Sequence, residues 1–152
     1  MIGRARPERS LRGRALALLA RREHSPWELR RKLAPHAESA EALDALLAAL
    51  EREKLLSADR FVESLVHRRS PGFGTARIRQ ELQSHALPRP LVEAATASLR
   101  DGELARARDV WARRFGVVAT DPRERARQQR FLAQRGFSIE VIRRVVQSGD
   151  DD

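Results

Sequence analysis

The sequence of 152 residues contains no cysteine and no tyrosine, and it has few other aromatic residues. Without cysteine, disulfides and thiolate metal sites are excluded. No apolar run approaches the roughly 18 residues that span a bilayer, and the stretch from Met1 to Arg14 lacks the apolar block of a signal peptide. We therefore expect a cytoplasmic protein that does not enter a membrane.

Lysine is also scarce, because Lys32 and Lys54 are the only two among 30 basic residues. A GC-rich genome imposes this preference for arginine on any protein, but it does not explain why the net charge is +9. An excess of positive charge indicates an anionic partner, such as nucleic acid or the acidic face of a protein.

Helix signals recur along the chain, and the apolar residues are mainly Leu, Ala and Val, which favours helix over strand. Ser25-Pro26-Trp27-Glu28 combines a serine N-cap, a proline in the first turn and a nearby glutamate, so a helix is predicted to open at Pro26. Further helix starts are predicted at Ser39, Ser57, the turn Ser70 to Gly74, Pro88 to Pro90, Asp121-Pro122 and Ser138.

The helices repeat with a period near fifty residues. Leu33 to Leu82 is 49 residues and Leu82 to Leu132 is 50, which places these leucines at equivalent buried positions of three middle helices. The pattern is typical of tandem helical repeats and predicts an all-α, elongated array of three three-helix repeats. The expected division is a flexible N-terminal segment (1–9), three repeats (10–56, 57–101 and 102–149) and an acidic tail (150–152).

Three arginine pairs stand at the ends of the first helices of the repeats. One interpretation is that these cations only complement the helix macrodipole, which contributes about 0.3–1 kcal/mol each. The other is a partner-binding surface, continued by arginines of the middle helices. Its members are Arg21, Arg22, Arg68, Arg69, Arg113 and Arg114 from the pairs, with Arg77, Arg79, Arg127 and Arg130.

Residue patterns for catalysis or metal binding are not found. None of the four histidines has a histidine or cysteine four residues away, and Gly72-Phe73-Gly74 lacks the remaining residues of a phosphate-binding loop. We therefore expect no enzyme and no cofactor. Trp27 and Trp111 lie among apolar neighbours at helical spacing and are predicted to pack in the core or between repeats.

The middle helices could also act as recognition helices of helix-turn-helix modules, because they are short, basic and preceded by a turn. No asparagine is available to read adenine, although Gln80, Gln128 and Gln129 could serve. A sequence-independent DNA-binding module therefore remains an alternative.

Three stretches resemble the RecX family: ALALLARREHSPWELRRKL (15–33), GTARIRQEL (74–82) and RFLAQRGFSIEVI (130–142). The link Leu55 to Phe61 is similar to that between the first and second repeats of this family. One departure is Ser84-His85-Ala86, where the family commonly has a glycine.

The resemblance implies a curved array of three-helix repeats that binds the RecA filament. It implies a monomeric regulator that inhibits RecA ATPase and strand exchange in recombination, DNA repair and the SOS response, although some members support RecA instead. Direct contact with single- or double-stranded DNA is left open, since DNA phosphates and an acidic protein surface attract the same arginines.

Overall fold

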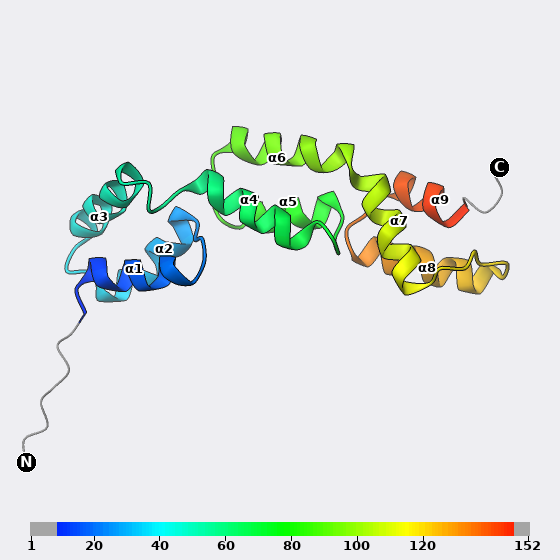
Figure 1. The fold of residues 1–152 in the computed structure, drawn as a ribbon, viewed down its shortest axis with the longest axis horizontal. Coiled ribbons are helices and arrows are strands. Elements are labelled where there is room, and N and C mark those ends of the chain that lie inside the picture. The colour runs from blue at the N-terminus through cyan, green and yellow to red at the C-terminus, as the bar shows by residue number, and fades with distance from the viewer. Residues whose placement is uncertain (1–8, 148–152) are drawn as a thin grey trace, which may run out of the picture. The chain divides into compact units, whose positions relative to one another are not determined.

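The computed structural model describes residues 9–147, which form α-helices joined by short turns, with no β-strand in this range (Figure 1). The predicted segments 1–9 and 150–152, apart from Arg9, lie outside the described residues. The helices are α1 (Leu11–Arg21), α2 (Pro26–Leu33), α3 (Ala40–Arg52), α4 (Ala58–Arg69), α5 (Thr75–Gln83), α6 (Arg89–Asp101), α7 (Glu103–Arg114), α8 (Pro122–Gln134) and α9 (Ile139–Gln147), with a 3-10 turn at Ala34–His36. No helix in this range is long and apolar enough to cross a membrane.

The predicted helix starts are confirmed, and side chains cap many of them. At four of these starts a serine accepts a hydrogen bond from a backbone N–H three residues on, at 3.1–3.2 Å, which satisfies one of the unpaired donors of the first turn. These serines are Ser25, Ser39, Ser57 and Ser138. Asp121 caps α8 through the N–H of Arg123 at 2.9 Å.

The chain divides into two compact units, one ending at Phe61 and the other beginning at Val62. The predicted repeat boundaries stay predictions. In the first unit, α2 packs on α1 and α3 around a small aliphatic core. Its buried members are Ala15, Leu29, Leu33, Leu43, Leu47, Leu50 and Leu56.

In the second unit, α5 packs on α6, α6 contacts α7, and α7, α8 and α9 contact one another. The last three helices enclose their own apolar core. It consists of Ala107, Val110, Leu132, Phe137, Ile142, Val145 and Val146.

The predicted repeat register holds in the core. Leu33, Leu82 and Leu132 are at most 1% exposed, so all three middle helices bury the equivalent leucine. An ion pair repeats in the same register: Arg30 of α2 pairs with Asp44 of α3, and Arg79 of α5 pairs with Glu93 of α6. Both residues of the second pair lie 49 positions after their counterparts.

The turns after the middle helices differ between repeats. Gly136 after α8 has φ 89°, and Ala86, fifty residues earlier, has φ 50°. Both backbones are left-handed, a region that costs an L-residue about 1–2 kcal/mol and a glycine almost nothing. Ala86 thus keeps the left-handed turn that Gly136 makes fifty residues later.

The two tryptophans behave differently. Trp111 packs beside the core of α7 to α9, as predicted, and its Nε1 donates to Gln128 Oε1 at 2.9 Å. Of the two positions predicted for Trp27, in the core or between repeats, the core position is wrong, because this side chain is 36% exposed. The Arg31 guanidinium lies 4.7 Å from the centroid of its ring, and this contact lets a large aromatic side chain remain at the surface.

Candidate arginine-rich binding surface

The three arginine pairs share one arrangement. The second arginine of each pair contacts a side chain of its own repeat, whereas the first forms no ion pair with the described residues. Arg22 and Arg69 hold carboxylates, and Arg114 lies over phenylalanine rings. We call the first arginines of the pairs, together with Arg130 of α8, the outward set; its members are Arg21, Arg68, Arg113 and Arg130, and all four are exposed.

Arg22 anchors the start of α2. Its Nη1 and Nη2 donate to the two carboxylate oxygens of Glu28, at 2.9 and 2.6 Å. The hydrogen bond from Arg22 lowers the pKa of Glu28 to about 2, and the same bond raises the pKa of Arg22. Arg22 therefore has a structural partner in its own repeat, and its predicted role in partner binding stays a prediction.

His24 lies beside this ion pair and is 1% exposed. Its Nδ1 is 3.0 Å from the Arg22 carbonyl oxygen, and its Nε2 is 3.0 Å from Lys32 Nζ. Since the lysine ammonium can only donate, Nε2 accepts and Nδ1 carries the proton. Burial lowers the pKa of His24, which favours this neutral form.

Arg69 and Arg79 have structural partners as well. Arg69 at the end of α4 donates to both oxygens of Glu81 on α5, at 3.0 and 3.1 Å. Arg79 donates to Glu93 on α6 at 2.8 Å. These pairs connect neighbouring helices, and the predicted role of both arginines in partner binding stays a prediction.

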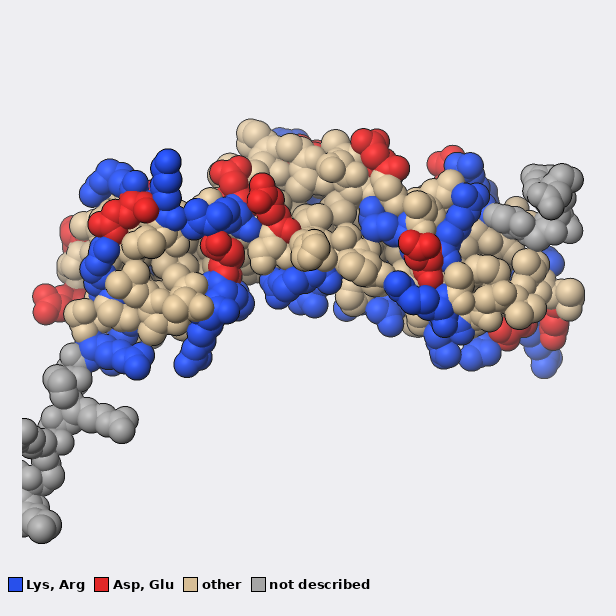
Figure 2. All heavy atoms as spheres, in the orientation of Figure 1, with Lys and Arg blue, Asp and Glu red and all other residues tan. Residues whose placement is uncertain are grey.

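The outward set is available to a partner. Arg21, Arg68 and Arg130 are exposed and form no ion pair with residues 9–147. Arg113 is exposed too and donates one hydrogen bond, to the Pro71 carbonyl oxygen at 2.6 Å. Figure 2 shows Lys and Arg side chains gathered along the lower edge of the second unit.

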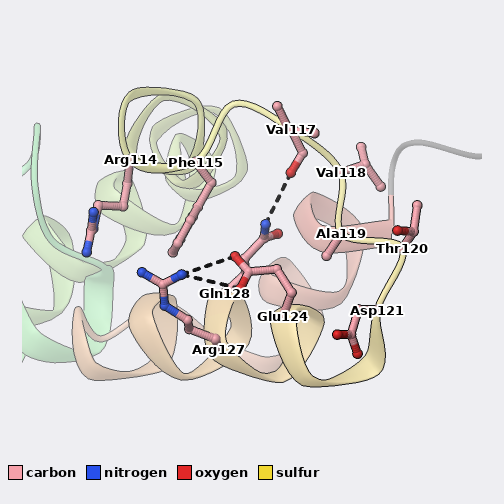
Figure 3. A pocket seen from close by; sticks show the side chains of 10 residues that line it. All are labelled: Arg114, Phe115, Val117, Val118, Ala119, Thr120, Asp121, Glu124, Arg127 and Gln128. Atoms are coloured by element: carbon pink, nitrogen blue, oxygen red, sulfur yellow. Dashed lines mark hydrogen bonds and ion pairs between the residues drawn. The ribbon is translucent and has the colours of Figure 1, made fainter.

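Four arginines and three phenylalanines of the second unit alternate in a continuous series, which we call the Phe–Arg stack. In order, its members are Arg77, Phe73, Arg135, Phe131, Arg114, Phe115 and Arg127. Each guanidinium carbon lies 4.7–5.8 Å from the centroid of the neighbouring ring, within the range of cation–π attraction. Figure 3 shows the Phe115 side chain between those of Arg114 and Arg127.

Two glycines bring the start of α5 close to the end of α8 and so position the stack. Gly74 N donates to the Arg135 carbonyl oxygen at 2.8 Å. A Cβ on Gly74 would lie 2.3 Å from backbone atoms of Gly136, and a Cβ on Gly136 would lie 2.5 Å from the Cβ of Arg77. Only glycine permits so close an approach of the two turns.

Glu103 strengthens the same junction from within. It is 6% exposed, and its Oε1 accepts hydrogen bonds from Thr75 N and Ser138 N, both at 3.3 Å. One carboxylate therefore joins the start of α5 to the start of α9. Sequence reasoning missed this role, because the partners lie 28 and 35 residues away and no local pattern links them.

A cleft of about 410 Å³ borders the Phe–Arg stack at the turn between α7 and α8 (Figure 3). Several polar groups in it already have partners: Gln128 donates to the Val117 carbonyl oxygen, and Glu124 pairs with Arg127. Gln128 is 2% exposed and therefore cannot contact a base edge, which was its role in the helix-turn-helix alternative. Residues 9–147 contain no cluster of metal-binding side chains.

Comparisons with known proteins identify the family. A model described as "RecX, second three-helix domain" matches residues 59–95, and one described as "RecX, third three-helix domain" matches residues 101–146. The chain is 53% identical over 141 residues to "Regulatory protein RecX" of Ralstonia nicotianae, covering 93% of this chain and 89% of the relative. The chain belongs to the RecX family. RecX of Leptothrix cholodnii is 52% identical over 147 residues, covering 97% of this chain and 94% of the relative.

RecX crystal structures share the fold. The structure of RecX from Lactobacillus salivarius matches with a TM-score of 0.76 at 18% identity, covering 92% of this chain and 94% of that one. The predicted all-α fold of three-helix repeats is confirmed. RecX is a family of regulatory proteins, and this chain is a member of it.

Proposed function

We propose that this RecX family member binds the RecA recombinase filament and inhibits its ATPase and strand-exchange activities in recombination, DNA repair and the SOS response. The observation that carries the proposal is identity of up to 53% to regulatory RecX proteins over nearly the whole chain. We further propose that it acts in the cytoplasm as a monomer, without catalysis of its own.

The outward set supports a regulator that works by contact. The first arginine of each pair is exposed, so exposed cations recur along the chain at about the spacing of the repeats. A filament presents the same protein surface many times, and linked weak contacts to such a partner act at high effective concentration. We assign these contacts to Arg21, Arg68, Arg113 and Arg130. Arg22, Arg69 and Arg79 hold the repeats in shape.

The experiment is a titration of the purified chain into RecA assembled on single-stranded DNA, with ATP hydrolysis and strand exchange as readouts. Both rates should fall at chain concentrations well below that of RecA, since one bound regulator affects several filament subunits. Affinity for the filament should exceed affinity for bare DNA. Unchanged rates at equimolar chain, or stronger binding to bare DNA than to the filament, would refute the proposal.

A further inference from the structure

We propose that the Phe–Arg stack binds the sugar–phosphate backbone of a single nucleic-acid strand. This inference goes beyond the proposed regulation of RecA, because it needs no RecA and assigns a direct ligand. It begins from an imbalance of charge: within the part of the chain that the structure describes, Arg77, Arg114 and Arg135 form no ion pair. Only Arg127, at one end of the stack, has a carboxylate, that of Glu124 at 3.3 Å.

The rings hold the guanidinium groups ready for an anion. Arg135 lies 5.1 Å from the Phe73 centroid and 5.2 Å from that of Phe131, so one cation contacts two rings. Contact with a ring face does not consume N–H donors, and the planar guanidinium can still donate in pairs to a phosphate. Because the side chains are already ordered by the rings, less conformational entropy is lost when an anion binds.

The remaining contacts of the stack also favour binding over pure stabilisation. Arg77 donates to the Gln134 carbonyl oxygen at 3.1 Å through Nη1 and is otherwise exposed. Arg114 is exposed, and its contacts are the rings of Phe115 and Phe131. Four cations gathered in one series repel one another, and an anionic ligand would relieve this repulsion.

A nucleic-acid strand matches this arrangement better than a protein does. Its phosphates recur at a regular interval along one strand, and the arginines of the stack recur in a continuous series with one ring between neighbours. The three phenylalanines are half-buried, so part of each ring faces solvent. Unstacked bases can rest against these apolar edges and against the guanidinium planes, while a duplex hides the faces of its bases.

The test measures binding of a fluorescent single-stranded oligonucleotide by anisotropy, without RecA, over a range of salt concentrations. In the test variant, Arg77→Gln, Arg114→Gln and Arg135→Gln are combined. Single-stranded DNA loses a slope of about 0.7 in log K against log salt per phosphate contact, so the slope should fall by about 2. Affinity should drop at least tenfold, with an unchanged circular dichroism spectrum.

The matched control removes the same charge from other exposed positions of the second unit, with Arg100→Gln, Arg108→Gln and Arg143→Gln combined. It should lose less than threefold. Phe73→Leu keeps every charge and should weaken binding about threefold with little change in slope, because the ring that orders Arg77 and Arg135 is gone.

Equal losses in the two triple variants would show that net charge alone attracts DNA and would overturn the proposal, as would wild-type affinity of Phe73→Leu. Duplex of the same sequence should bind more weakly, and equal or tighter duplex binding would overturn the assignment to a single strand. If the stack bound a polyglutamate peptide and not DNA, its partner would be an acidic protein surface, and the proposal would be overturned. Because RecA is absent, none of these outcomes depends on the RecA assay.

Discussion

The backbone angle of Ala86 reflects the equivalence of the helical repeats. Ala86 has φ 50° in the turn after α5, and Gly136 has φ 89° in the equivalent turn after α8. Ala86→Gly should raise the free energy of unfolding by about 0.5–1 kcal/mol, because relief of the left-handed backbone exceeds the entropy that glycine adds to the unfolded chain. Urea denaturation measures the change. Gly136→Ala is the reciprocal control and should destabilise more than Ala86→Gly stabilises, since its Cβ would lie 2.5 Å from that of Arg77. A loss of stability in Ala86→Gly would contradict the account.

Glu28 gives a prediction for pH. Its pKa is lowered to about 2 in the folded chain, from 4.5. The Arg22–Glu28 pair therefore contributes its full stability above pH 4.5 and loses it as the pH falls towards 2. Glu28→Gln should cost about 1 kcal/mol at pH 7, because Arg22 is partly exposed and solvent screens the pair.

Glu28→Gln should also make the free energy of unfolding depend less on pH at the acid end, as measured by urea denaturation at several pH values between 2 and 7. Glu63→Gln, at an exposed position of α4, is the control and should follow the wild-type curve. If Glu28→Gln loses the same free energy at pH 2.5 as at pH 7, the ion pair is not what lowers this pKa.

Helices and their starts were predictable because their causes are local. A serine cap and the first turn that it completes lie within four residues, and the period of buried leucines is visible in the order of the chain. The junction between α5 and the end of α8 was not predictable. It depends on Gly74 meeting Gly136 and on Glu103 reaching two N–H groups from distant segments.

At the scale of the helices, the prediction concerns Glu103. Glu103→Ala leaves the N–H groups of Thr75 and Ser138 without their acceptor, and each buried unpaired donor costs about 1–3 kcal/mol. We expect a loss of about 2–4 kcal/mol in urea denaturation and faster amide exchange at the starts of α5 and α9. Glu63→Ala should change stability by less than about 0.5 kcal/mol. An equally small change in Glu103→Ala would mean that the junction is held by the glycines alone.

Over the whole molecule, the role of the arginines in partner binding stays a prediction. The sequence places a pair at the end of each first helix, but it does not indicate which arginine of a pair holds a carboxylate. Carboxylates elsewhere decide this: Glu28 holds Arg22 and Glu81 holds Arg69, and Arg21 and Arg68 form no ion pair with the described residues. The Phe–Arg stack was missed for the same reason, because its members come from α5, α7, α8 and the adjoining turns.

The exposed arginines can be reversed without breaking an ion pair of the fold. The variant combines Arg21→Glu, Arg68→Glu and Arg130→Glu, one from each predicted repeat. The matched control combines Arg52→Glu, Arg100→Glu and Arg143→Glu, which are also exposed, form no ion pair with the described residues and come one from each predicted repeat. Circular dichroism and the urea midpoint should be unchanged in both, because exposed substitutions seldom alter stability by more than about 0.5 kcal/mol.

The most direct measurement is the chain concentration that halves RecA ATP hydrolysis on single-stranded DNA, compared among the wild type and these two variants. We predict an increase of at least tenfold for the outward-set variant and of less than threefold for the control. Wild-type inhibition by a folded outward-set variant, or equal losses in the two variants, would contradict the claim that these arginines bind the RecA filament.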